Sequence, residues 1–200
     1  MSVSSPVTCV VVMGVSGVGK STTAELLAER LGWPMAEADG FHPQPNIDKM
    51  SASIALTDAD RIPWLHAIRD WISERAAAGE SVVVTCSALK RTYRDVLRQA
   101  DARVRFVYLH TTTGVVQRRI AGRSGHFMPP ALLGSQFADL EALESDEDGV
   151  VVDPRASPGE VAETALVLLG LASPAPPDPP SPPAPPLPPT LLTSRRTTGA

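Results

Sequence analysis

The chain has 200 residues, a hydrophobic share of 43% and a formal net charge of −4. This length favours a single domain, and the negative charge argues against a basic surface of the kind that binds nucleic acids or anionic membranes. Eleven of the 20 prolines lie between Pro174 and Pro189, so the composition changes sharply near the C-terminus. We therefore expect a folded domain over residues 1–172 and a proline-rich, disordered tail over residues 173–200.

The sequence also argues against membrane, secreted and zinc-binding classes. Its longest apolar runs are far shorter than the roughly 20 residues of a membrane helix. No basic residue precedes the first apolar run, as a secretory signal would require. Cys9 and Cys86 each lie at or beside an expected strand, and we expect both to be buried free thiols of a cytoplasmic protein. None of the four histidines has the Cys/His spacing of a zinc site.

In the first half of the chain, expected strands alternate with expected helices. The first strand is a continuous β-branched run, which is typical of a strand buried on both faces. Strands are predicted at Val7–Met13 and Pro34–Ala38, and helices at Ser21–Leu31 and from Thr57, as cap, to about Ala78. The intervening segment Gly40–Ala55 is rich in Pro, Asn, His and Asp and shows no clean period.

The alternation continues in the second half, apart from an irregular segment at Gly122–Pro130. Strands are predicted at Ser81–Cys86, Val104–Leu109 and Gly149–Val152, and helices at Arg91–Gln99, Thr113–Ala121, Ala131–Leu143 and Pro158–Leu171. Strands that alternate with helices predict an α/β fold with a parallel sheet, here of five strands flanked by helices.

A glycine-rich motif between the first strand and the first helix carries the strongest functional signal. Residues Gly14–Ser21 read GVSGVGKS, a full match to the P-loop pattern in its required strand–helix context. Glycines let backbone N–H groups point at phosphate oxygens, and Lys20 reaches the β- and γ-phosphates while the Ser21 hydroxyl ligates Mg²⁺. The predicted nucleotide-binding residues are Gly14, Val15, Ser16, Gly17, Val18, Gly19, Lys20, Ser21 and Thr22.

The motif by itself predicts binding of ATP or GTP. A guanine-specific switch needs an asparagine in its base-reading motif, and the only asparagine, Asn46, stands in a different context, Asn46-Ile47-Asp48. Large motor and transporter ATPases need more chain than 200 residues. A guanine-specific switch and the large ATPases are therefore excluded, while the acceptor of the phosphoryl group stays open at this point.

Two carboxylates follow the second expected strand, where a parallel sheet opens its ligand crevice. Asp39 could accept the proton of an attacking hydroxyl during phosphoryl transfer, and Glu37 could hold Mg²⁺ through water. The alternative for both residues is a solvated strand end. The polar loop Phe41–Met50, with His, Asn, Asp and Lys, suits recognition of a polyhydroxylated acceptor, although polar loops are common.

Arginines lead from the helix at residues 113–121 into the glycine-containing segment after it. Arg119 and Arg123 are four residues apart, so they share a helix face, and Arg118 lies beside them. Closure of a lid over about residues 119–130 would bring Arg119 and Arg123 onto the charge of the transferring phosphate as catalytic residues. The sequence leaves open which of the two contacts adenine and which contacts phosphate. The alternative is a solvated basic helix end.

Taken together, the motifs resemble those of the small P-loop, thermoresistant-type gluconokinases, which are relatives of shikimate kinase. The blocks that carry the resemblance, besides the P-loop, are His42–Asn46 (HPQPN), Asp60–Leu65 (DRIPWL), Cys86–Lys90 (CSALK), Gly125–Phe127 (GHF) and Ser135–Phe137 (SQF). The resemblance covers about Val10 to Leu169 and does not include the tail. One departure is that Ser53 and Ala55 stand where the family usually has glycine and proline before a leucine.

The resemblance implies MgATP-dependent phosphorylation of the 6-hydroxyl of D-gluconate, giving 6-phospho-D-gluconate and ADP. It also implies a nucleoside-monophosphate-kinase-like sheet in the order 2-3-1-4-5, and a homodimer. By analogy, Asp39 is the base and Glu37 is associated with magnesium. The implied substrate-binding residues are Asp39, His42, Arg61, Lys90, Arg94 and His126, with the planar guanidinium of Arg61 favoured for the gluconate carboxylate.

Two alternatives remain at this stage. One is a related kinase that acts on shikimate or another sugar acid. The other is a nucleotide-binding regulatory protein that has kept the phosphate-binding loop and lost phosphoryl transfer, against which the presence of Asp39 and both arginines argues.

Overall fold

The computed structural model describes residues 6–121 and 133–172. Its centre is a parallel sheet of five strands in the order β2-β3-β1-β4-β5. The strands are β1 (Thr8–Met13), β2 (Met35–Glu37), β3 (Val82–Thr85), β4 (Arg103–Leu109) and β5 (Gly149–Val152). The predicted α/β fold class and the strand order implied by the resemblance are both confirmed.

The central strand β1 is buried along its whole length because it lies between β3 and β4 and helices cover both faces of the sheet. Val10 pairs in register with Val83 of β3 and with Arg105 of β4. Alternate residues of β1 serve different cores, since Val11 and Met13 belong to one hydrophobic cluster and Val10 and Val12 to the other. The β-branched run that predicted the strand thus fills two cores at once.

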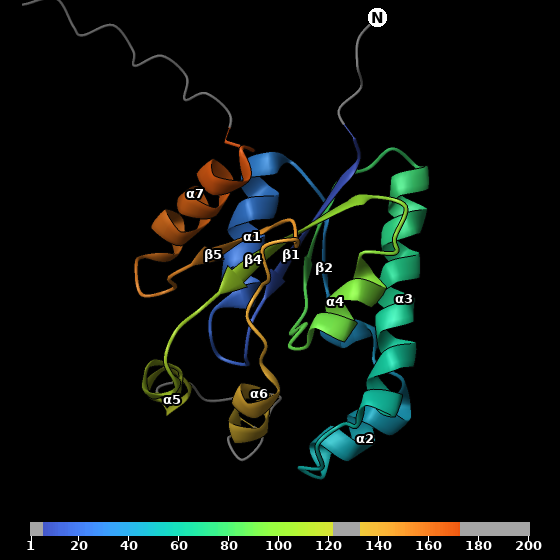
Figure 1. Ribbon diagram of the computed structural model, residues 1–200, viewed down its shortest axis with the longest axis vertical. Coiled ribbons are helices and arrows are strands. Elements are labelled where there is room, and N and C mark those ends of the chain that lie inside the picture. Colours follow the sequence, from blue (N-terminus) through green and yellow to red (C-terminus); the bar gives the residue numbers. More distant parts are fainter. Residues whose placement is uncertain (1–5, 122–132, 173–200) are drawn as a thin grey trace, which may run out of the picture.

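Helices cover the two faces of the sheet, as Figure 1 shows. The cluster with Val10 and Val12 is completed by α1 (Lys20–Leu31) and α7 (Pro158–Leu169). The cluster on the other face is completed by α3 (Asp58–Ala77) and α4 (Arg91–Leu97). Thr57 and Ser157 begin α3 and α7 with reciprocal capping-box hydrogen bonds to Asp60 and Glu160.

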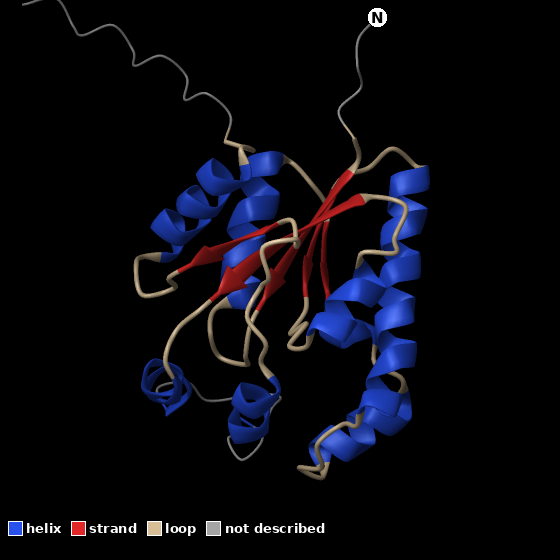
Figure 2. Cartoon of the chain, in the orientation of Figure 1, coloured by secondary structure: helices blue, strands red, loops and turns tan. Residues whose placement is uncertain are grey.

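The remaining helices lie at the end toward which the strand arrows point in Figure 2. They are α2 (Gln44–Ser51), α5 (Thr113–Ala121) and α6 (Leu133–Asp139), and a short 3₁₀ segment, η1 (Ala38–Phe41), joins β2 to α2. In an open α/β sheet, ligands bind outside the carboxyl ends of the strands. These elements therefore surround the edge at which a site is expected.

Two sequence expectations about local structure are wrong. Segment Gly40–Ala55, for which no helix was expected, contains the end of η1 and all of α2, because Pro45 lies in the first turn of α2, where a missing N–H costs nothing. The helix expected over Ala131–Leu143 ends at Asp139. Beyond it, the Glu141 N–H donates to the Leu89 carbonyl at 2.8 Å, a contact across the fold that replaces a further helical turn.

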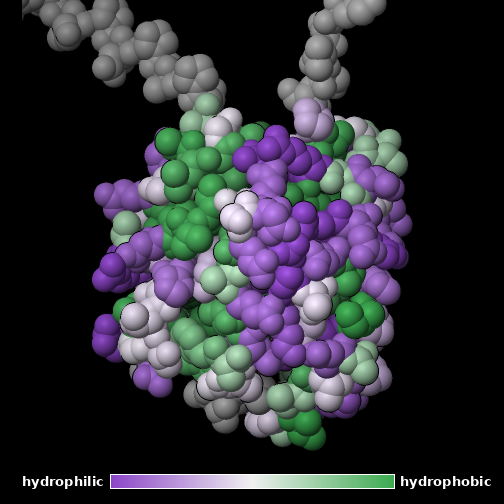
Figure 3. Space-filling view, in the orientation of Figure 1, coloured by the Kyte–Doolittle hydropathy of each residue, from purple (hydrophilic) through white to green (hydrophobic). Residues whose placement is uncertain are grey.

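The hydropathy of the surface differs across the face in Figure 3. Hydrophobic residues gather over α7 and β5, and a hydrophilic band lies beside them. Among the large hydrophobic side chains that are exposed, Val151 lies on β5, and Val167 and Leu168 lie on α7. Within residues 6–121 and 133–172, no helix combines the length and apolar character needed to cross a bilayer.

Candidate functional site

The P-loop wraps tightly between β1 and α1 because its glycines adopt conformations that other residues avoid. Gly14 and Gly17 have φ values of 137° and 77°. A Cβ at Gly14 would lie 2.9 Å from the Leu109 carbonyl oxygen, and one at Gly17 would lie 2.6 Å from a side-chain carbon of Ile120. The loop therefore has no room for side chains at these points, and α1 begins directly after it at Lys20. A helix N-terminus preceded by such a loop is a ready anion-binding site.

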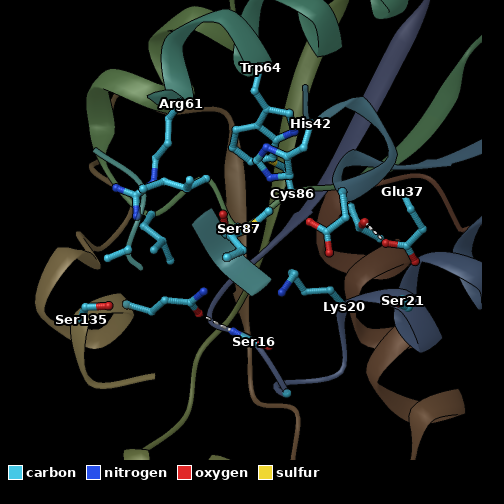
Figure 4. Close-up of a pocket in the computed structure, with 18 of the residues that line it drawn as sticks. Ser16, Lys20, Ser21, Glu37, His42, Arg61, Trp64, Cys86, Ser87 and Ser135 are labelled. Carbon is cyan, nitrogen blue, oxygen red and sulfur yellow. Dashed lines mark hydrogen bonds between the residues drawn. The ribbon is translucent and has the colours of Figure 1, made fainter. Parts of the chain in front are cut away.

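The P-loop forms one wall of a cavity of about 190 Å³ at the carboxyl end of the sheet. The other walls come from the end of β2, η1, α2, α3, the loop after β3, and α6 (Figure 4). The lining polar and aromatic side chains include Ser16, Lys20, Ser21, Thr22, Glu37, Asp39, His42, Arg61, Trp64, Thr85, Ser87, Ser135 and Gln136. The structure thus brings together residues from five separate sequence motifs.

Lys20 curls back over the P-loop, and its Nζ donates to the Val15 carbonyl at 3.1 Å. Burial lowers the pKa of this ammonium group, while the carboxylates of Asp39 and Glu37 and the Cys86 thiol act in the opposite direction. An anionic phosphate beside Lys20 would favour the charged form further. The Lys20 ammonium group therefore lies where it can bind a phosphate group held by the P-loop.

Glu37 and Ser21 supply oxygen donors on the same side of the cavity. The Thr85 hydroxyl donates a hydrogen bond to the Glu37 carboxylate, which fixes its direction. No group of three His, Cys, Asp or Glu residues that could hold a metal occurs in the described parts of the chain. One carboxylate and one hydroxyl nevertheless fit Mg²⁺, which commonly takes one or two protein ligands together with water and substrate phosphates.

Asp39 lies on η1, whose position is set by a buried tryptophan of α3. The Trp64 indole N–H donates to the Ala38 carbonyl at 2.7 Å, and Trp64 and Ala38 are only 3% and 1% exposed. Because the hydrogen bond reaches the residue directly before Asp39, it fixes the backbone that carries the carboxylate. Asp39 itself is exposed in the open cavity.

This contact gives a prediction about stability. Trp64→Phe keeps an aromatic ring but removes the only N–H donor of that side chain, leaving the buried Ala38 carbonyl without this partner. We expect the free energy of unfolding to fall by about 1–3 kcal/mol, measured by urea denaturation. Trp71→Phe, at a half-buried position on the same helix, is the matched control. Equal losses in the two variants would contradict a specific role of the Trp64 hydrogen bond.

His42 follows η1 and stacks on Trp64 with a ring-centroid distance of 4.3 Å and an interplanar angle of 14°. Burial lowers the pKa of His42, and the nearby Arg61 guanidinium acts in the same direction, while Asp39 partly opposes them. The imidazole is therefore neutral at neutral pH.

Arg61 reaches the cavity from the first turns of α3, held by groups on two other elements. Its Nη1 donates to the Tyr93 hydroxyl at 2.8 Å and to Asp139 at 3.2 Å, and the guanidinium lies 5.5 Å from the centre of the Tyr93 ring. Lys90 lies next to this network but pairs with Asp58 at 2.9 Å. Lys90 is not among the residues that line the cavity, so its predicted direct contact with the substrate is not supported.

The substrate-binding role predicted for Arg94 is wrong. Its side chain is completely buried and pairs with the equally buried Glu147 at 2.6 Å. Its remaining donors reach the carbonyls of Ala88 and Leu89, and those of Glu141 and Ala142. Arg94 therefore connects the loop after β3 to the segment after α6 and has no donor left for a substrate.

A second cavity, of about 420 Å³, lies on the other side of the P-loop. It is lined by Gly17, Val18, Gly19, Thr22, Thr23, Arg118, Arg119, Pro154, Ala156, Pro158 and Val161. Arg119 donates to the Val18 carbonyl at 2.8 Å and to the Pro154 carbonyl. Arg119 thus lines this cavity and is not among the residues that line the cavity with Asp39. Arg123, His126 and the rest of the expected lid, residues 122–130, lie outside the described residues.

Gln136 of α6 was not among the predicted site residues. Its amide oxygen accepts a hydrogen bond from the Ser16 N–H of the P-loop at 2.7 Å (Figure 4). The sequence block Ser135–Phe137 was part of the family resemblance, so this signal was available. Gln136 is 120 residues away from Ser16 along the chain. The sequence alone could not show that α6 packs against the P-loop.

Comparisons with known proteins agree with this geometry. A family model described as an AAA domain matches residues 9–143. A gluconokinase of Gluconobacter oxydans (strain 621H) is 50% identical over 153 residues, which cover 76% of this chain and 86% of that protein. The range of the family model includes the P-loop and the residues around the first cavity.

Solved structures give the same result. A sugar kinase from Janibacter sp. HTCC2649 has a TM-score of 0.80 and 51% identity, covering 84% of this chain and 96% of that one. A gluconokinase from Sinorhizobium meliloti 1021 has a TM-score of 0.73 and 47% identity, covering 82% and 92%. With its P-loop, its five-stranded sheet and these matches, the chain belongs to the gluconokinase family of P-loop kinases.

Proposed function

We propose that the protein transfers the γ-phosphoryl group of ATP to the 6-hydroxyl of D-gluconate, giving 6-phospho-D-gluconate and ADP. The observation that carries the proposal is the first cavity, in which the P-loop residues Lys20 and Ser21 share walls with Asp39, His42 and Arg61. A phosphate donor and a hydroxylated acid can therefore meet there. The named activity of the relatives supports gluconate as the acceptor.

The nucleotide would span both cavities. The backbone N–H groups of residues 14–22 and the Lys20 ammonium would bind the phosphates. The second cavity adjoins the same loop through Gly17, Gly19 and Thr22. Arg119 would lie against the nucleoside there, since a guanidinium can stack on an aromatic base.

Magnesium fits the oxygen donors of Ser21 and Glu37, as described above. When bound, it would neutralise charge on the nucleotide phosphates. Glu37 stays directed toward that side of the cavity by its hydrogen bond from Thr85.

On the acceptor side, Asp39 would act as the base. The 6-hydroxyl oxygen forms a bond to the γ-phosphorus while the bond from phosphorus to the ADP oxygen breaks, and the hydroxyl proton passes to the Asp39 carboxylate. Arg61 would bind the gluconate carboxylate at the other end of the substrate. Lys20 would stabilise negative charge on the transferring group.

The direct test is ADP release by the purified protein with MgATP, with and without D-gluconate. We expect release that depends on gluconate. Equal or faster turnover with shikimate or another sugar acid would replace gluconate as the acceptor. Nucleotide binding without release for any acceptor would favour the regulatory alternative.

Arg119 provides a separate prediction for the second cavity. Arg119→Ala should raise the KM for ATP by about 10-fold, as loss of one charged contact predicts, with a smaller change in kcat and in the KM for gluconate. Initial rates at varied ATP and gluconate concentrations measure all three. Arg98→Ala, at an exposed position after α4, is the control. A fall in kcat with an unchanged KM for ATP would assign Arg119 to the transferring phosphate instead.

The wider assignments follow from the same family resemblance. We propose that residues 1–172 form one kinase domain that acts as a cytoplasmic homodimer. The apolar side chains exposed on α7 and β5 are compatible with a contact between subunits. Analytical ultracentrifugation measures the oligomeric state.

A further inference from the structure

A buried asparagine lies behind the first cavity. Asn46 of α2 is only 3% exposed and is not among the residues that line the cavity. Its amide nitrogen donates to the backbone carbonyl of Asp60 at 2.9 Å and lies 3.3 Å from Nδ1 of His42. The spacing of four residues between His42 and Asn46 brings the two side chains together at the start of α2.

These two contacts together determine where the hydrogen of the His42 ring lies. A backbone carbonyl can only accept, so the atom of Asn46 that faces Asp60 must be the NH₂ group. The same nitrogen faces Nδ1 of His42, and an NH₂ group is a donor only, so Nδ1 must be the acceptor. In a neutral imidazole one nitrogen accepts and the other donates, which leaves the hydrogen on Nε2.

The surroundings keep the ring in one plane and without charge. Stacking on Trp64 at 4.3 Å fixes the orientation of the ring. The charged groups that face it are Asp39 from η1 and Arg61 from α3, and burial together with Arg61 outweighs Asp39, so that the pKa of His42 is lowered. A neutral ring with Nδ1 already engaged has a single polar hydrogen to offer, and His42 lines the cavity.

We propose that Asn46 is a positioning residue that holds His42 in its Nε2–H tautomer, so that the imidazole presents one hydrogen-bond donor to an oxygen of the acceptor substrate. The part of this proposal that concerns the substrate rests on the proposed function. The proposal also separates the roles of His42 and Asp39. A ring whose Nδ1 accepts a hydrogen bond and whose Nε2 carries hydrogen does not take up the proton of the attacking hydroxyl. That task is left to Asp39.

The tautomer can be measured without any substrate. In the full-length protein labelled with ¹⁵N-histidine, long-range ¹H–¹⁵N correlation spectra at neutral pH distinguish the two ring nitrogens. The chain has four histidines, so the His42→Gln variant identifies the signals of His42. We expect an unprotonated Nδ1 and a protonated Nε2, and averaging between tautomers in Asn46→Ala. A protonated Nδ1, or averaging in the unmodified protein, would overturn the proposal.

Kinetics test the same point through two amides of different length. The amide of glutamine at position 42 reaches toward the place of Nε2, whereas that of asparagine reaches only toward Nδ1. We expect kcat/KM for gluconate to be at least about 10-fold higher in His42→Gln than in His42→Asn, with similar KM values for ATP. Greater activity in His42→Asn would contradict the proposal.

Asn46 itself is tested against a neighbour on the same helix. Asn46→Ala should raise the KM for gluconate by about 10-fold and leave the KM for ATP unchanged. Gln44→Ala, which removes an exposed amide of α2, should change neither. If the protein releases no ADP in response to gluconate, the proposed function fails, whereas the spectra of His42 still decide the tautomer.

Discussion

Asp39→Asn is expected to reduce gluconate-dependent turnover by about 10²–10⁴-fold, the usual contribution of a general base, while nucleotide binding stays nearly unchanged. The substitution conserves size, and the segment that carries residue 39 is fixed independently by the hydrogen bond between Trp64 and Ala38. The variant amide can still lie against the acceptor hydroxyl, but it cannot take up its proton. Loss of activity would therefore report chemistry and not folding.

Single-turnover rates and a titration with a fluorescent ATP analogue measure the two quantities separately. Asp48→Asn, an exposed carboxylate on α2 that pairs with Gln44, is the matched control and should behave like the unmodified protein. Near-normal turnover of Asp39→Asn would remove Asp39 from the role of base. A parallel loss of nucleotide affinity would assign it instead to the phosphates or their metal ion.

The largest effect on stability is expected at Arg94. Arg94→Met should lower the free energy of unfolding by about 3–5 kcal/mol, because it leaves the Glu147 carboxylate buried without its counter-charge. Both side chains are fully buried, and two hydrogen bonds of 2.6 and 2.8 Å join them. Arg98→Met, near the end of the same helix at an exposed position, should have little effect.

A double-mutant cycle separates the pair from its surroundings. Arg94→Met combined with Glu147→Met should be clearly less destabilising than the sum of the single variants, because neither charge is then left alone. Urea denaturation of the four proteins measures the coupling. Additive losses would mean that the contacts of Arg94 with the four carbonyls, and not the ion pair, dominate its contribution.

The same pair makes stability depend on pH in a definite direction. Desolvation alone would raise the pKa of Glu147, but hydrogen bonds from Arg94 and from the Glu144 N–H outweigh it and lower the pKa. A lowered pKa in the folded state stabilises the protein above the unfolded value of about 4.3, and this contribution is lost as pH falls further. The difference between the unmodified protein and Arg94→Met should accordingly shrink as pH falls, and it should be smallest below about pH 4.

The elements that could be predicted from sequence are those whose signal is local. The β-branched run of β1 and the glycine spacing of the P-loop each describe their own conformation, and both elements occur where they were predicted. The strand order came from the family resemblance and not from periodicity. Helix α2 was missed because Pro43, Pro45 and the polar residues around them resemble a loop, although Pro43 is the N-cap of the helix and Pro45 lies in its first turn.

Long-range polar pairs explain the failures within the candidate site. Nothing local distinguishes Arg61, which reaches the cavity, from Arg94, which is buried, since both are arginines on expected helices and the family resemblance implies a substrate contact for each. The partner that decides the matter for Arg94 is Glu147, 53 positions away along the chain. At Ser53, by contrast, the local conformation explains the family pattern. Ser53 stands where the family usually has glycine, and its φ of 60° is a left-handed conformation that favours glycine.

Helix α6 joins the two halves of the proposed reaction. Its Gln136 binds the Ser16 N–H of the P-loop, and its Asp139 binds Arg61, the residue proposed for the gluconate carboxylate. A phosphate oxygen at Ser16 and a substrate carboxylate at Arg61 would each compete with a side chain of the same two-turn helix. Occupancy at one end should therefore alter affinity at the other, and thermodynamic reciprocity requires that ATP change the dissociation constant of gluconate by the same factor as gluconate changes that of ATP.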